Sequence, residues 1–320
     1  MSVARRVITP QEQIAEVPEK IFLFRSCTGS MEYPGTENAI KEVLKILGVE
    51  IVSDPDQSCC AGYILTCSGF TPEPALAVTA RNLGMVEQRY GLDTYVFCNG
   101  CYAYIRELAH VLHTHPDYMK QANDLISQWG YKYEEKTKIL HVQELYYLLL
   151  DKIKEKVVRP LTGLRVAAHY GCHYLAQQYN ILDEGDLPTF HEEIYEALGA
   201  TPVFYKHRRM CCGYAVGRGF THKESVVQPQ LSKKFDSAKE DGVELMTTTC
   251  PGCNVALDRE QPNLNKRGFG PYDIPVIDLG QLIALALGVP LWKLGFNANT
   301  TPMDGILTKL GLEKGEIGDE

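Results

Sequence analysis

Short apolar runs alternate with amphipathic segments along most of this 320-residue chain. Residues 21–24 and 165–169 are short, mainly apolar runs, which are typical of buried strands. Over residues 36–47 the apolar positions recur at i, i+3, i+4 and i+7, which predicts an amphipathic helix. A second such helix is expected over residues 190–198. Each of these two segments ends just before a glycine, the residue that most often terminates a helix.

The same order of elements occurs twice, which indicates an internal duplication. Strands alternating with helices favour βαβ units and parallel sheets. We therefore expect an α/β fold made of two Rossmann-like halves related by a pseudo-twofold axis. The remaining strands are expected at residues 49–52, 93–97, 201–205 and 244–248, and strand–helix passages at 139–150 and 274–287.

The repeat also divides the chain into domains. The first domain is expected at residues 21–156 and the second at 157–295. A charged run broken by Pro160, residues 152–163, is the expected linker. Residues 1–20 are an N-terminal extension, and residues 296–320 form a C-terminal tail whose polar end, from Lys309, is expected to be mobile.

Composition narrows the class of protein. An apolar fraction of 45% and a charged fraction of 22% are those of a globular protein. The formal net charge of −8 argues against a nucleic-acid partner, which would favour a basic surface. The apolar stretch at residues 279–291 is too short to span a bilayer, and the N-terminus lacks the apolar core of a signal peptide. We therefore expect a cytoplasmic protein without a transmembrane segment.

Ten of the eleven cysteines form two sets of five with the same spacing. The repeat offset is 145 residues for the first cysteine and 152 for the other four. Cys67 belongs to neither set and is expected to be an ordinary buried thiol. The first set is Cys27, Cys59, Cys60, Cys98 and Cys101; the second is Cys172, Cys211, Cys212, Cys250 and Cys253.

These cysteines are expected beyond the carboxyl ends of parallel strands, where sites gather in open α/β sheets. A CxxC motif at a strand-to-helix turn can aim two sulfurs at one centre, and nearby glycines let backbone N–H groups approach them. Structural zinc would need four ligands per site and leave one thiolate unused in each set. A dithiol redox motif would explain one CxxC motif only. Iron–sulfur ligation accommodates all ten and is favoured.

The two sets resemble the cysteine-rich CCG domains of heterodisulfide reductase B subunits, over residues 21–291. The segment Cys59-Cys60-Ala61-Gly62 departs from the family, which often has proline after the cysteine pair. The matching segments are residues 81–83, 98–102, 169–173, 210–213 and 274–276.

The resemblance implies two non-cubane [4Fe-4S] clusters, each held by one set of five cysteines. It also implies reduction of the coenzyme M–coenzyme B disulfide to two thiols, the last step of methanogenesis. We expect cleavage between the two clusters, with no protein thiol as nucleophile. The implied partners are the ferredoxin-like and the flavin-bearing subunits of heterodisulfide reductase, its C and A components. The complex can also contain a hydrogenase or a formate dehydrogenase. Flavin and nucleotide are expected on another subunit, because no dinucleotide or Walker-type motif is present here.

Other residues are candidates for substrate contact. His173 follows a cluster cysteine and is a possible proton donor to a leaving thiolate, although such a histidine can also bond a cluster sulfur or a carbonyl. The basic run Lys206, His207, Arg208 and Arg209 could bind the anionic groups of the substrate, or simply form a solvated loop. Weaker candidates of the same kind are Arg25, Arg218 and Lys223.

Three alternatives stay open from the residues alone. The chain could relay electrons, as related glycolate oxidase, lactate-utilisation and succinate dehydrogenase subunits do with quinone. It could be a sulfur-oxidation homologue that handles a protein-bound disulfide. It could also be a structural zinc protein, which would be colourless.

Overall fold

Two parallel four-stranded sheets form the centre of the molecule, in a computed structural model that describes residues 17–62, 71–176, 188–214 and 221–312. The strand orders are β2-β1-β3-β4 and β6-β5-β7-β8, so the two sheets have the same topology. This confirms the predicted α/β fold with two similar halves. The strands are β1 (Lys20–Phe24), β2 (Glu50–Val52), β3 (Thr94–Val96), β4 (Ile139–His141), β5 (Arg165–His169), β6 (Thr201–Pro202), β7 (Leu245–Thr248) and β8 (Val276–Asp278).

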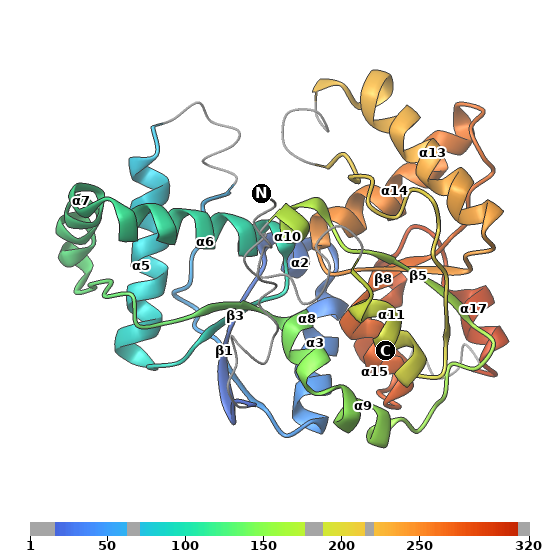
Figure 1. Cartoon of the computed structure of the whole chain (residues 1–320), viewed down its shortest axis with the longest axis horizontal. Helices are drawn as coiled ribbons and strands as arrows, with labels where there is room; N and C mark the ends of the chain where they lie inside the picture. Colours follow the sequence, from blue (N-terminus) through green and yellow to red (C-terminus); the bar gives the residue numbers. More distant parts are fainter. Residues whose placement is uncertain (1–16, 63–70, 177–187, 215–220, 313–320) are drawn as a thin grey trace, which may run out of the picture.

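Helices connect the strands and cover both faces of each sheet (Figure 1). In the first half they are α2 (Cys27–Glu32), α3 (Pro34–Ile46), α5 (Glu73–Arg89), α6 (Asn99–Thr114), α7 (Pro116–Ile126), η1 (Ser127–Trp129), α8 (Val142–Leu148) and α9 (Leu150–Lys156). In the second half they are α10 (Cys172–Ala176), α11 (Phe190–Ala197), η3 (Lys223–Val227), α13 (Gln228–Glu240), α14 (Pro251–Lys266), α15 (Leu279–Ala286), α16 (Leu291–Leu294), η4 (Phe296–Ala298) and α17 (Asp304–Lys309).

The central strands are buried because their apolar side chains face helices on both sides. Residues 21–24 of β1 and 166–169 of β5 are each at most 1% exposed. The registers match as well: Phe24 pairs with Val96, and His169 pairs with Thr248. The two halves therefore place their strand ends at equivalent points.

Several predicted boundaries differ from the structure, and three of the differences have an identifiable reason. Helix α9 continues to Lys156, inside the predicted linker, because Ile153 is buried and α9 packs against α11. Strand β6 is limited to Thr201–Pro202, because Pro202 has no N–H to donate and the chain turns soon afterwards. Helix α3 begins two residues early, at Pro34, where proline suits the first helical turn.

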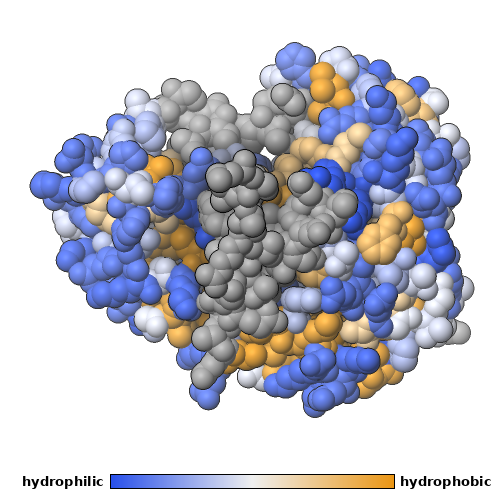
Figure 2. Space-filling model, viewed as in Figure 1, coloured by the Kyte–Doolittle hydropathy of each residue, from blue (hydrophilic) through white to orange (hydrophobic). Residues whose placement is uncertain are grey.

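The two halves pack against each other through equivalent helices. Helix α3 contacts α15 as α11 contacts α8, and α2 contacts α14 as α10 contacts α6. These reciprocal pairs place a pseudo-twofold axis between the halves, which lie side by side in Figure 1. Buried polar contacts reinforce the packing, including a 2.9 Å hydrogen bond from the Tyr33 hydroxyl to Asp258. Figure 2 shows mostly hydrophilic residues on the outer flanks of both halves.

The ends of the chain are described only in part. Residues 1–16 of the N-terminal extension and 313–320 of the tail lie outside the described residues, as does Cys67. Within the predicted C-terminal tail, Ile306 and Leu307 of α17 are buried, and the N–H groups of Thr300 and Thr301 donate to Asp258. Among the helices of the described ranges, none has the length and apolar character needed to cross a membrane.

Gly35 lies where α3 meets the C-terminal end of α16, and this contact gives a test of the interface. A Cβ at position 35 would lie 2.1 Å from the Leu294 carbonyl oxygen, so backbone would have to move. We expect Gly35→Ala to lower the free energy of unfolding by about 1–3 kcal/mol, measured by urea denaturation. Gly305→Ala is the matched control, because its Cβ would meet open space on a helix. Equal effects of both substitutions would contradict this view of the interface.

Candidate functional site

The cysteines lie at the ends of the central strands, at helix N-termini. Cys98 follows β3 and is the N-cap of α6, and Cys250 follows β7 and is the N-cap of α14. Cys27 and Cys172 begin α2 and α10, just after β1 and β5. The partial positive charge at the N-termini of the two 16-residue helices α6 and α14 therefore faces sulfur, which favours thiolates.

Both cysteine sets open onto one shared cavity between the halves. It encloses about 760 Å³, its mouth included. Its described lining holds no Lys, Arg, Asp or Glu, so it is a largely apolar chamber walled by sulfur. Nine of the ten set cysteines line it: Cys27, Cys60, Cys98, Cys101, Cys172, Cys211, Cys212, Cys250 and Cys253.

The sulfurs are crowded but not joined by disulfides. The Sγ atoms of Cys212 and Cys253 lie 3.3 Å apart, and those of Cys172 and Cys211 lie 3.5 Å apart. The Sγ atoms of Cys98 and Cys250 approach to 3.9 Å across the boundary between the halves. All ten set cysteines are free thiols.

Cys59 has a different position from its counterpart Cys211. It is exposed and lines a neighbouring hollow, which shares Ser26 and Cys27 with the main cavity. Its side chain thus lies at the outer rim of the first set.

The vicinal cysteine pairs are followed by a residue in left-handed backbone conformation. Ala61 has φ 61° and Gly213, at the equivalent position, has φ 77°. In the second half this turn lets the Gly213 N–H donate to the Cys211 sulfur at 3.3 Å. Alanine adopts this conformation at a cost, so the turn at Ala61 is strained, and a proline after the pair, as the family often has, could not adopt this φ.

Neighbouring sulfurs have opposite acidities because they share protons. Hydrogen bonding with Cys101 lowers the pKa of Cys60, and the same contact raises the pKa of Cys101. Hydrogen bonds with Cys253 and then Cys98 lower the pKa of Cys250 well below its usual range. In the second set, hydrogen bonding with Cys172 lowers the pKa of Cys211.

The donor set fits iron–sulfur centres. Thiolates this close repel one another unless protons or cations lie between them, and apolar burial opposes their ionisation. Polynuclear iron is bound by such groups of thiolates, with backbone N–H groups and helix dipoles stabilising the negative charge. The residues that would hold iron in the cavity are the nine set cysteines that line it, and Cys59 stands at its rim.

Asn99 holds the first CxxC motif against the second half. Its amide nitrogen donates to the Tyr170 carbonyl at 2.8 Å, and its amide oxygen accepts from the Thr249 hydroxyl at 3.3 Å. Asn99 is 1% exposed, so these bonds are shielded from water. The position of Cys98 and Cys101 therefore depends on both halves.

The structure separates the other predicted site residues. His173 lines the cavity, with its ring 5.3 Å from that of Tyr104. Lys206, His207, Arg208 and Arg209 are absent from the described lining, and buried Arg208 pairs with Glu192 at 3.1 Å. Arg25 pairs with Glu37, Lys223 pairs with Glu260, and Arg218 lies outside the described residues.

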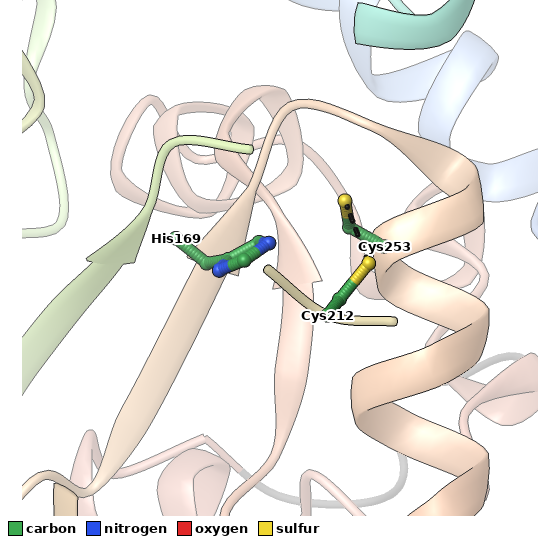
Figure 3. A group of neighbouring side chains, drawn as sticks. All are labelled: His169, Cys212 and Cys253. Carbon is green, nitrogen blue, oxygen red and sulfur yellow. Dashed lines mark hydrogen bonds between the residues drawn. The ribbon is translucent and has the colours of Figure 1, made fainter. Parts of the chain in front are cut away.

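Two buried groups beside the second set escape detection in the sequence. His169 is 1% exposed, and burial lowers the pKa of its imidazole to about 3. It lies against the sulfurs of Cys212 and Cys253, with the three ligand atoms within 4.8 Å of one another (Figure 3). Lys234 is 0% exposed, and burial lowers its pKa to about 7. A repeat comparison that looked beyond cysteine would have singled out both positions.

Two carboxylates cap the helices that follow the edge strands β4 and β8. Asp278 caps α15 by accepting from the Gly280 N–H at 2.8 Å, and Glu144 accepts from the His141 N–H at 2.8 Å in the capping box of α8. Burial raises the pKa of Asp278 to about 8 and that of Glu144 to about 7.

Comparison with known proteins identifies the family. A family model for the cysteine-rich domain matches twice, at residues 21–106 and 166–258. The chain is 33% identical over 295 residues to the B component of the ferredoxin/F420H2-dependent CoB-CoM heterodisulfide reductase of Methanosarcina acetivorans, covering 91% of this chain and 97% of that one. It is 30% identical over 311 residues to the B component of the ferredoxin:CoB-CoM heterodisulfide reductase of the same organism, covering 93% and 99%. The chain belongs to the family of heterodisulfide reductase B subunits, which have duplicated cysteine-rich domains.

Other similarities place this family in a wider group of reductase subunits. The chain is 29% identical to the 8-methylmenaquinol:fumarate reductase membrane anchor subunit of Wolinella succinogenes, over 90% of this chain and 98% of that one. The fold matches a solved structure of a hypothetical protein from Helicobacter pylori, with a TM-score of 0.68 and 14% identity. That match covers 90% of this chain but only 53% of the solved one. Family and cysteine sets together indicate an iron–sulfur subunit of a reductase.

The buried cap at Asp278 gives a test by pH. Its carboxyl titrates near pH ~4 in an unfolded chain, so the folded chain binds this proton more tightly. Its stabilising contribution is complete below pH ~4 and is lost as the pH rises towards 8. Asp278→Asn keeps the helix cap but cannot ionise. We expect its free energy of unfolding to rise by about 2–5 kcal/mol relative to that of the parent chain as the pH goes from 4 to 9.

The measurement is the free energy of unfolding of both chains at each pH. Glu144→Gln is the comparison variant. The rise in its free energy of unfolding relative to the parent chain should level off at a lower pH, near 7. A stability difference for Asp278→Asn that stays constant with pH would show that Asp278 is ionised throughout.

Proposed function

We propose that this chain is the catalytic subunit of a heterodisulfide reductase, which reduces the coenzyme M–coenzyme B disulfide to two thiols. The observation that carries the proposal is the single cavity shared by both cysteine sets. A disulfide bound there lies within reach of both halves at once. The similarity to two curated heterodisulfide reductase B subunits along nearly their whole length supports the same substrate.

The proposed cofactors are two non-cubane [4Fe-4S] clusters, one held by each set of five cysteines. When bound, the two centres would supply one electron each, which together meet the two-electron requirement of disulfide cleavage. The fifth cysteine of the first set, Cys59, stands at the rim rather than in the cavity. Its inclusion in the ligand set is a part of the proposal that direct measurement can settle.

The chain's own residues shape the substrate site. The apolar lining excludes water from the reacting sulfurs and accommodates the alkyl arms of a small disulfide. The uncharged lining means that the anionic ends of the substrate extend towards the mouth. The proposed contact for these anionic groups is the basic run at residues 206–209, which lies outside the described lining, with Lys206 and Arg209 exposed and Arg208 held by Glu192.

His173 is the proposed proton donor. It is partly buried and lines the cavity, with its ring 5.3 Å from that of Tyr104. From there it can deliver one of the two protons that the two product thiols require to a thiolate leaving the substrate, and the other thiolate takes its proton from solvent on release. The expected partners are the ferredoxin-like and the flavin-bearing components of the reductase, with a hydrogenase or formate dehydrogenase as an optional further module.

An electron-relay role is the second candidate, favoured by the similarity to a membrane anchor subunit of a quinol-linked fumarate reductase. The two functions predict different behaviour of the purified chain. A relay protein would bind iron but would be indifferent to the substrate thiols. A catalytic protein would change its EPR spectrum when oxidised in the presence of coenzyme M.

The decisive experiment starts from anaerobically purified chain. We expect about eight irons and a similar amount of acid-labile sulfide per chain, with an EPR signal that coenzyme M alters. Cys98→Ser and Cys250→Ser should each lose about half of the iron and abolish viologen-dependent reduction of the heterodisulfide. Cys67→Ser is the matched control, because Cys67 belongs to neither set.

Three results would contradict the proposal. Zinc in place of iron would identify a structural protein. Full iron content in both serine variants would remove the ligand assignment. Normal iron content with an EPR signal unaffected by coenzyme M, and no turnover of the heterodisulfide, would favour the relay function.

The role of His173 has its own test. We expect His173→Gln to lower the turnover number by about 10²-fold or more, with iron content unchanged. The loss should shrink at lower pH, where solvent supplies the proton more readily. His113→Gln is the matched control, because His113 is an exposed histidine paired with Glu135 on the surface. Unchanged turnover in His173→Gln would assign the proton to another donor.

A further inference from the structure

The two halves carry different residues at two equivalent buried positions beside the cysteines. Phe24 ends β1 and His169 ends β5. They pair with Val96 and Thr248, each of which precedes the first cysteine of its CxxC motif by two residues. The duplicated fold therefore places an aromatic hydrocarbon beside one site and an imidazole beside the other.

The second difference is on helices α5 and α13, whose side chains bind the loops that carry the vicinal cysteine pairs. Asn82 of α5 and Lys234 of α13 are 152 residues apart, the offset of four of the five cysteine pairs. Asn82 binds the chain before Cys60, donating to the Cys59 carbonyl at 2.9 Å and accepting from the Ser58 N–H at 3.1 Å. Lys234 holds the equivalent loop, which precedes Cys211.

The contacts of Lys234 are those of a charged ammonium group. Its Nζ donates to the carbonyls of His207 at 2.9 Å, Arg208 at 3.1 Å and Met210 at 3.1 Å. An ammonium has three N–H donors and no acceptor, so each donor has a partner, whereas a neutral amine would aim a lone pair at a carbonyl. Within residues 17–62, 71–176, 188–214 and 221–312, no carboxylate forms an ion pair with Lys234.

The cations beside the first set are balanced or exposed. Arg25 pairs with Glu37, and Arg89 pairs with Asp54 at 2.7 Å. Arg81 is partly exposed, and its guanidinium donates to the amide oxygen of Asn82. Water screens such charges strongly, whereas the field of a fully buried cation persists over several ångströms.

His169 adds unused hydrogen-bonding capacity on the same side. Both ring nitrogens lack a hydrogen-bond partner in the described part of the chain, although the side chain is buried. A buried imidazole without a partner is costly, so its position against Cys212 and Cys253 indicates an acceptor there (Figure 3). Phe24 offers no such donor to the first set.

We propose that Lys234 and His169 make the iron–sulfur centre of the second half the more easily reduced of the two. The inference rests on the proposed function, since it requires a centre in each half. A buried cation and an N–H donor both stabilise the extra negative charge of a reduced centre. The duplicated protein would then accept its first electron on the side of Cys211 and Cys212. Both residues act through the centre and are positioning residues rather than catalytic ones.

The test is an EPR-monitored redox titration of the anaerobically purified chain. The parent chain should show two separate midpoint potentials. We expect Lys234→Asn, which copies the first half, to lower the higher midpoint by at least tenfold in the reduction equilibrium, or 59 mV for one electron. His169→Phe should lower the same midpoint and leave the other unchanged. Lys233→Asn is the matched control, because Lys233 is the exposed neighbour on the same helix.

Each result decides the question. Unchanged midpoints in Lys234→Asn and His169→Phe, at parental iron content, would overturn this inference and leave the proposed function standing. An iron-free parent chain would overturn the proposed function itself. If circular dichroism shows that Lys234→Asn does not fold, Asn82→Lys gives the reciprocal test and should raise the lower midpoint. His169→Phe removes no hydrogen bond of the described residues and stays informative in either case.

Discussion

The molecule is organised around the approach of two CxxC motifs across its pseudo-twofold axis. Cys98 and Cys250 lie 3.9 Å apart, each at the N-terminus of a long helix and each following a central strand. Equivalent helices pack reciprocally on either side and hold the strand ends of the two α/β halves this close. The pairs α3–α15 and α11–α8 provide that packing. The shared sulfur-lined cavity is the direct geometric result.

Much of this arrangement is encoded in patterns that a single sequence displays. Apolar runs and helical periodicity locate the central strands, and the repeat of cysteine spacing establishes the duplication. Because parallel strands end at one edge of a sheet, the position of Cys27, Cys98 and their counterparts at that edge follows from chain order. The helix ends at Gly48 and Gly199 could also be predicted from the sequence. Both glycines adopt the expected left-handed backbone, with φ 78° and 82°.

What the sequence could not supply depends on contacts between distant segments. Lys234 is one of several lysines in a polar helix, and a comparison of the repeats marks its position but does not show that it is buried beneath the loop at residues 207–210. The continuation of α9 to Lys156 depends on a partner, α11, that lies some forty residues further along the chain. The sequence predicted that Arg208 could bind a ligand, but its guanidinium forms an ion pair with Glu192. In each case a contact with a distant segment, and not the local sequence, decides the burial, length or pairing of the residues.

The bonds from Asn99 to Tyr170 and Thr249 have a consequence for biosynthesis. During translation the amino-terminal half emerges first, but its CxxC motif finds its fixed geometry only after the polypeptide beyond residue 249 has been made. The fixed geometry of the CxxC motif at Cys98 and Cys101 is therefore a property of the finished polypeptide, and the two halves complete their cysteine sites together rather than in the order of their synthesis.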